Sequence, residues 1–156
     1  MSAEPPLPWG DGPPPVVLLA ALREIAAFAR EEPPPGAILF VRDLAAGESH
    51  TVAMSPHASL GAMVGAAATA VRAGLIIMPW ALDPKAVLLC AVATELDPRT
   101  GAYSAMVLGC DPDYTLAYLD LGTSRGLVPV VPDGPGRHLL PVVPQMRMMW
   151  DAFITA

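Results

Sequence analysis

Residues Lys85–Cys110 read KAVLLCAVATELDPRTGAYSAMVLGC and combine strong β-strand propensity with a clear turn signal. The pattern predicts two strands, Ala86–Glu95 and Ala102–Cys110, which fold back on each other as a hairpin. Between them, DPRTG at Asp97–Gly101 supplies a proline with fixed φ, an aspartate that can bond its own backbone, and a glycine that tolerates positive φ. We expect the remainder of the chain to pack around this hairpin.

Both faces of the predicted hairpin are uncharged if Leu96 pairs with Ala102 across the turn. The first face then holds Leu88, Cys90, Val92 and Thr94 with Ser104, Met106, Leu108 and Cys110. The second face holds smaller residues, namely Val87, Leu89, Ala91 and Ala93 with Tyr103, Ala105, Val107 and Gly109. Strands that are apolar on both faces are covered on both faces, so these two are expected at the centre of a layered sheet.

The segment Pro56–Ala73 predicts a helix that covers the small-residue face of the hairpin. Ser55 is the expected N-cap and Gly74 the expected end of this helix. Gly61 and Gly65 lie four residues apart on one side of it, and glycine inside a helix costs about 0.5–1 kcal/mol relative to alanine. Close backbone contact explains both glycines, and the contact could be with the sheet, with a second copy of the chain or with a ligand.

The other elements follow from periodicity and from the placement of proline and glycine. A helix is expected at Pro13–Glu32, with the apolar stripe Leu18, Leu22, Ile25 and Ala29. Strands are expected at Ala37–Leu44, Ser49–Met54 and Leu75–Leu82, and Tyr114–Leu121 fits either a strand or a short helix. After an irregular, proline-rich segment near 123–144, a helix is expected at Gln145–Ile154, with the stripe Met146, Met149, Trp150 and Phe153.

These elements predict an α+β fold in which helices pack on an antiparallel sheet of about five strands. The element order α-β-β-α-β-β-β-α is similar to that of profilin-like and roadblock-type domains, a resemblance in order alone. A proline-rich arm at residues 1–12 is expected to precede a single domain at 13–156. Trp9 is the large anchor of that arm, which either trails freely or docks on its own domain or a neighbour.

Composition narrows the classes of function. The chain of 156 residues is 53% hydrophobic, which excludes disorder throughout, and its net charge of −6 without a basic run argues against nucleic-acid binding. No signal peptide is recognisable, and Gly74 and Pro79 interrupt the apolar run that could otherwise span a membrane. Cys90 and Cys110 show no metal spacing and are expected to be buried free thiols, diagonal to each other across the hairpin. A cytoplasmic protein is therefore expected.

No motif for catalysis, metal or cofactor binding is present, so no cofactor is expected. His57 lies beside Ser55 and Ser59, but all three residue types are also common at helix starts. The segment Gly122-Thr123-Ser124-Arg125-Gly126 could hold an anion through its amides, hydroxyls and guanidinium, although flexible loops have the same composition. Met146, Met149, Trp150 and Phe153 either complete the core or form an interface.

Three functions remain open at this point. The preferred hypothesis is a non-enzymatic interaction or structural protein that forms a homo-oligomer or binds a protein partner, through Trp9, the Gly61–Gly65 face and the closing helix. The alternative is a domain that binds a small apolar or anionic ligand between the helix at 56–73 and the sheet. The third is a hydrolase-like enzyme that uses His57 or a cysteine.

Overall fold

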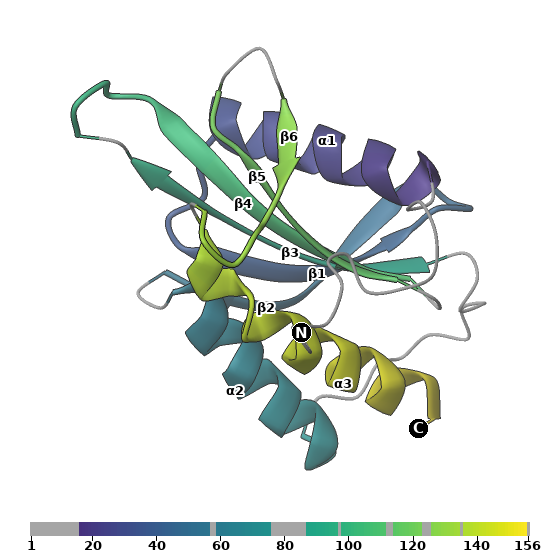
Figure 1. The fold of residues 1–156 in the computed structure, drawn as a ribbon. Coiled ribbons are helices and arrows are strands. Elements are labelled where there is room, and N and C mark those ends of the chain that lie inside the picture. The colour runs from purple at the N-terminus through teal and green to yellow at the C-terminus, as the bar shows by residue number, and fades with distance from the viewer. Residues whose placement is uncertain are drawn as a thin grey trace, which may run out of the picture.

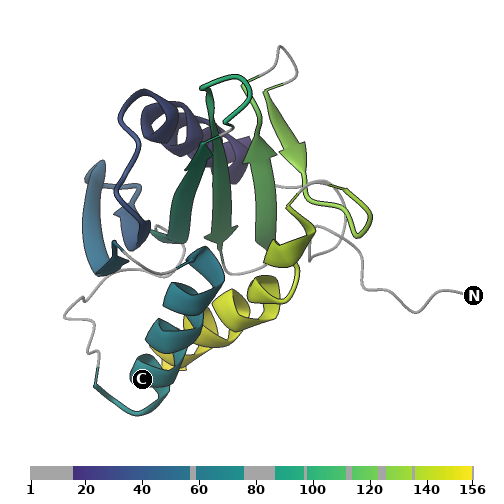
Figure 2. The same ribbon diagram turned by 90° about the vertical axis from the view of Figure 1, so that its left-hand side faces the viewer.

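The computed structural model describes residues 16–56, 59–75, 87–96, 98–111, 114–122, 126–134 and 136–155, with only the backbone for 153–155. The described elements form three layers, in which a six-stranded antiparallel sheet lies between one helix and a pair of helices (Figures 1 and 2). The order of the strands across the sheet is β2-β1-β3-β4-β5-β6. This is the α+β class and the element order predicted from the sequence, with six strands instead of five.

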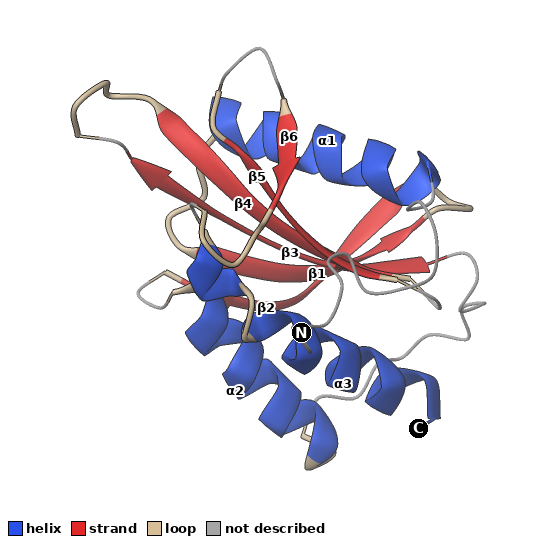
Figure 3. Ribbon diagram, in the orientation of Figure 1, coloured by secondary structure: helices blue, strands red, loops and turns tan. Residues whose placement is uncertain are grey.

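The helices and strands follow one another along the chain in this order (Figure 3). Helix α1 (Val16–Glu31) is followed by the hairpin of β1 (Ala37–Asp43) and β2 (Glu48–Ser55), then by α2 (Leu60–Arg72), and next by β3 (Val87–Leu96), β4 (Tyr103–Cys110), β5 (Thr115–Asp120) and β6 (Leu127–Pro129). A short 3-10 helix, η2 (Arg137–Leu139), leads into α3 (Val142–Thr155). Within the described residues, no helix is long and apolar enough to cross a membrane.

Two hydrophobic cores fill the spaces between the layers. Helix α1 packs on one face of the sheet, mainly against β4 and β3, through its predicted stripe of Leu18, Leu22, Ile25 and Ala29. Helices α2 and α3 pack on the other face and against each other. Strand β3 is buried from Val87 to Ala93, so both of its faces are covered, as its uncharged sequence predicted.

The β3–β4 hairpin is confirmed, but its predicted register is wrong by one residue. Leu96 pairs with Tyr103 instead of Ala102, because the turn is one residue longer than assumed. Since side chains alternate along a strand, this shift moves all of β4 to the opposite face relative to β3. The small residues predicted to share one face are therefore divided between the two cores, with Ala91 and Ala93 beneath α2 and α3, and Ala105 and Gly109 beneath α1.

Helix α2 begins four residues later than predicted. Its N-cap is Ser59, whose side chain accepts a hydrogen bond from the backbone N–H of Ala62 at 3.1 Å, and not Ser55, which ends strand β2. Gly74 follows the helix with φ of +75°, consistent with its predicted role at the C-terminus. The helix covers the sheet with Leu60, Met63, Val64, Ala67 and Ala68, all of which are buried.

The C-terminal half of the chain contains more regular structure than predicted. Tyr114–Leu121, whose sequence fits either a strand or a short helix, contains strand β5, and the segment expected to be irregular contains β6 and η2. Helix α3 begins at Val142, three residues before the predicted start, because Pro144 is tolerated in a first helical turn. Residues 1–15, with the predicted arm and Trp9, lie outside the described residues, as does most of the strand predicted at Leu75–Leu82.

Candidate functional site

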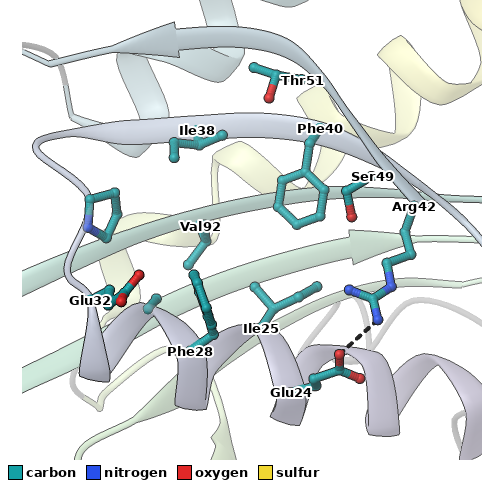
Figure 4. Close-up of a pocket in the computed structure, with 12 residues that line it drawn as sticks. Glu24, Ile25, Phe28, Glu32, Ile38, Phe40, Arg42, Ser49, Thr51 and Val92 are labelled. Carbon is teal, nitrogen blue, oxygen red and sulfur yellow. Dashed lines mark hydrogen bonds and ion pairs between the residues drawn. The ribbon is translucent and has the colours of Figure 1, made fainter. Parts of the chain in front are cut away.

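The candidate site is a groove of about 440 Å³ between α1 and the β1–β2 end of the sheet (Figure 4). We call it the α1–β1 groove. Ile25, Phe28 and Ala29 of α1 form one wall, and Ile38 and Phe40 of β1 with Val92 of β3 form the floor. Volumes of 300–1,000 Å³ with mainly apolar walls are typical of ligand-binding clefts.

The groove exists because α1 is too narrow to cover the whole face of the sheet. Strand spacing of about 4.8 Å makes a six-stranded sheet about 24 Å wide between its outer strands, whereas one helix is about 10 Å across. Helix α1 contacts β3, β4 and β5, and β1 and β2 extend beyond it (Figure 2). Ile38 and Phe40 are therefore only partly buried, and Phe28 at the edge of α1 is 62% exposed.

Polar groups lie at the ends and along the outer edge of the groove. At one end, Arg42 of β1 donates a hydrogen bond from Nη2 to Oε1 of Glu24 at 2.8 Å, which links the strand to α1. Glu32 lies near the other end (Figure 4). The hydroxyls of Ser49 and Thr51 on β2 line the outer edge. One of the three charged groups is a guanidinium that already pairs with a carboxylate, so the groove carries an excess of one negative charge.

Arg30 of α1 lies on the side of the helix away from the groove. Its Nε donates to the backbone oxygen of Tyr103 at 3.0 Å and its Nη1 lies 3.6 Å from Asp120. Burial raises the pKa of Tyr118 on β5, and the charge of Arg23 partly opposes this rise. Arg30 thus faces β4 and β5, while Glu24 and Glu32 line the groove.

The predicted interface residues of the closing helix lie inside the domain's own core. Met146 and Met149 are fully buried and Trp150 is almost so, packed between α3, α2 and the sheet. Of the two alternatives that the sequence left open, a core or an interface, these three side chains belong to the core, so none of them is available at the surface. The side chain of Phe153 lies outside the described residues, as does Trp9.

The two glycines of α2 lie against α3, not against the sheet. A Cβ at Gly61 would lie 3.1 Å from Cγ2 of Val142, and one at Gly65 would lie 3.2 Å from Oε1 of Gln145. Close contact therefore explains them, as predicted, but the neighbour is a helix of the same chain. The predicted ligand site between α2 and the sheet is replaced by a packed core.

The described ends of the predicted anion loop offer an anion little support. The backbone N–H of Gly122 donates to the carboxylate of Asp120 at 2.9 Å, so an anion would meet a negative charge there. Gly126 has φ of +68°, and Thr123, Ser124 and Arg125 lie outside the described residues.

The cysteines are free and fully buried, as expected, but they lie on opposite faces of the sheet. Cys90 belongs to the core beneath α1 and Cys110 to the core beneath α2 and α3, a consequence of the shifted register. Burial raises the pKa of each thiol from 9.0 to about 12, in Cys110 despite a contact of its Sγ with Thr115 Oγ1 at 3.2 Å. Neither thiol ionises near neutral pH, so neither is an activated nucleophile.

The remaining candidates for chemistry are few. His57 lies outside the described residues, and within the part of the chain that is described no group of three histidine, cysteine or acidic side chains could hold a metal ion. Comparisons with models of known families, with curated proteins and with solved structures found no match. The α1–β1 groove is therefore the feature from which a function can be argued.

The sequence did not predict the groove. Two of its features fit one: Phe28 lies at the edge of the apolar stripe of α1, and Ala37–Asp43 carries apolar residues on both faces up to Val41. Neither feature predicts a groove by itself, because the part of the sheet that stays uncovered depends on which strands α1 packs against.

Proposed function

We propose that this protein is a non-enzymatic interaction protein that binds an apolar part of another polypeptide in the α1–β1 groove. One observation carries the proposal: Ile38, Phe40 and Phe28 lie along a groove that no described element fills, with Phe28 62% exposed. Exposed apolar surface of this kind, bordered by polar side chains, is typical of interaction sites. The partner could be another protein or, as a homo-oligomer would require, a second copy of this chain.

An enzymatic function has less support among the described residues. Cys90 and Cys110 are protonated and enclosed, and the groove contains neither histidine nor cysteine. Its acidic residues, Glu24 and Glu32, lie near opposite ends of the groove, and Glu24 is engaged by Arg42. A general acid–base pair needs two groups within reach of one reacting bond, and this arrangement does not provide them.

A small apolar ligand is the second candidate, and the volume of the groove favours it. About 440 Å³ is within the range of small-molecule sites. An anionic ligand fits less well, because Arg42 is the groove's only cation and already pairs with Glu24. The proposed binding site for a small ligand therefore lies on the opposite face of the sheet from the site that the sequence predicted beneath α2.

The proposal is tested with Nile red, a neutral probe whose fluorescence rises in apolar surroundings. We expect the full chain to enhance its emission and Phe28→Ser to remove most of the enhancement. Met148→Ser is the matched control, because Met148 is 46% exposed on α3, away from the groove. Equal enhancement by the wild type and Phe28→Ser would place apolar binding elsewhere and refute the proposal.

Light scattering distinguishes the kinds of partner. If a second copy fills the groove, the wild type has a dimer mass that Phe28→Ser lowers to the monomer, and Met148→Ser remains a dimer. A monomeric wild type that binds Nile red in the groove supports a different polypeptide or a small ligand.

A further inference from the structure

We propose that the partner bound in the α1–β1 groove is a cationic amphipathic helix, which lies beside α1 along β1 and β2. The inference rests on the function proposed above and adds the shape and charge of the partner. Two independent features support it, namely the space left on this face of the sheet and the distribution of charge around that space.

The space matches a second helix. On the opposite face, α2 and α3 lie side by side and together cover the sheet (Figures 1 and 2). On the groove face, α1 is the one helix among the described residues, and a six-stranded sheet has room for two. A helix of about 14 residues is roughly 21 Å long, close to the roughly 23 Å of the seven-residue strand β1.

The groove also has the form that helix recognition requires. An amphipathic helix inserts side chains spaced i, i+3/i+4 and i+7 into an apolar groove. Figure 4 shows Ile38 and Phe40 on β1 facing Ile25 and Phe28 of α1, with the charged groups at the two ends.

The charge around the groove selects a basic helix over an acidic one. Glu24 of α1 and Glu32, which directly follows α1, line the groove, whereas Arg30 of α1 contacts β4 and β5 instead. Arg42 is the only basic residue in the lining, and its Nη2 is 2.8 Å from Glu24. Lysine or arginine side chains flanking the apolar stripe of the partner would pair with Glu32 and add to the Glu24–Arg42 pair.

Three synthetic peptides test the inference against the full chain. Each has about 14 residues with leucine at the stripe positions, and the other positions are lysine, glutamine or glutamate, respectively. Binding is measured by fluorescence anisotropy of the labelled peptide. We expect affinity in the order lysine, glutamine, glutamate, with a factor of about two to five for each facing carboxylate. The differences in affinity between the three peptides should become smaller when the salt concentration is raised from 0.05 M to 0.5 M, because salt screens the charges.

Charge-matched variants separate the groove from the general acidity of the protein. Glu32→Lys should weaken the lysine peptide about fivefold or more, and the fold tolerates it because a basic residue suits the C-terminal end of α1. Glu95→Lys makes the same change in net charge at an exposed position of β3 and should have little effect. Phe28→Ser should weaken all three peptides, and Met148→Ser none of them.

Each outcome supports or overturns a stated part of the reasoning. Equal affinity for the three peptides, or equal losses in Glu32→Lys and Glu95→Lys, overturns the cationic helix and leaves the proposed function standing. Binding of none of the peptides, with Nile red still bound in the groove, overturns the helix in favour of a small ligand. A dimer that dissociates only in Phe28→Ser assigns the groove to a second copy, and loss of both peptide and Nile red binding removes the proposed function too.

Discussion

Replacing each glycine of α2 by alanine sets two effects of similar size against each other. In the interior of a helix, alanine is favoured over glycine by about 0.5–1 kcal/mol. Against this gain stands contact with α3, in which the added Cβ would lie 3.1 Å from Val142 at position 61 and 3.2 Å from Gln145 at position 65. Both distances are shorter than ordinary van der Waals contact. Whether the neighbouring side chain can move away therefore decides whether the substitution stabilises or destabilises the protein.

The two neighbours differ in how easily they move. Gln145 is only partly buried, and its Oε1 is buried without a hydrogen-bond partner among the described residues, so rotation towards water relieves the contact and hydrates that oxygen. Val142 is buried and β-branched, so its χ1 is restricted. Position 61 also lies in the first turn of α2, where the gain from alanine is smaller. We therefore expect Gly65→Ala to stabilise by about 0.5–1 kcal/mol and Gly61→Ala to destabilise by about 0.5–2 kcal/mol.

Urea denaturation followed by circular dichroism measures this difference. With m near 1–3 kcal/mol/M, a change of 1 kcal/mol moves the midpoint by about 0.3–1 M, which is readily resolved. An unchanged m in both variants is required for the comparison. Midpoints that shift in the same direction for Gly61→Ala and Gly65→Ala would refute the reasoning, since they would show that the mobility of the α3 neighbour does not determine the outcome.

Three further predictions concern the cap, the thiols and the core beneath α1. Ser59→Ala should lower the free energy of unfolding by about 1 kcal/mol through loss of the N-cap bond, and Ser55→Ala should change the melting temperature little. Because burial raises the pKa of Cys90 and Cys110 to about 12, while an unfolded thiol ionises near 9.0, stability is unaffected below about pH 8 and falls as the pH rises from 9 towards 12. An alkaline denaturation series should show this fall, and reduced loss in Cys90→Ala would confirm its source. Leu22→Ala should cost about 2–5 kcal/mol in urea denaturation because Leu22 is fully buried, and a loss below 1 kcal/mol would contradict the packing of α1.

The layered α+β fold could be predicted because its central elements are strongly patterned. Strands β3 and β4 are apolar on both faces, and the stripe of α1 has the spacing of one helix face. The register of the hairpin could not be predicted with the same success, because DPRTG is compatible with turns that differ by one residue. That single residue decided which face held Gly109 and whether the two cysteines were neighbours.

The candidate site was harder to predict than the fold because it depends on long-range packing. The composition of α2 indicated a close contact, and the contact exists, but no local pattern states that Gly61 and Gly65 approach α3 and not the sheet. In the same way, Met146 and Trp150 have the residue types of an interface and also those of a core, and only the position of α2 distinguishes the two. The groove beside Phe28 arises because α1 covers only part of the sheet. This property depends on how the layers pack together and not on any local stretch of sequence.

The packing of α1 on β3 and β4 has a consequence for synthesis of the chain on the ribosome. Helix α1 is made before β4, the strand that it contacts most, and β4 is completed at Cys110, roughly 80 residues after Glu31. At translation rates of about 5–20 residues per second, about 4–16 s pass between the synthesis of α1 and the completion of the strand on which its apolar stripe packs. During this interval the nascent chain exposes an amphipathic segment to which chaperones can bind.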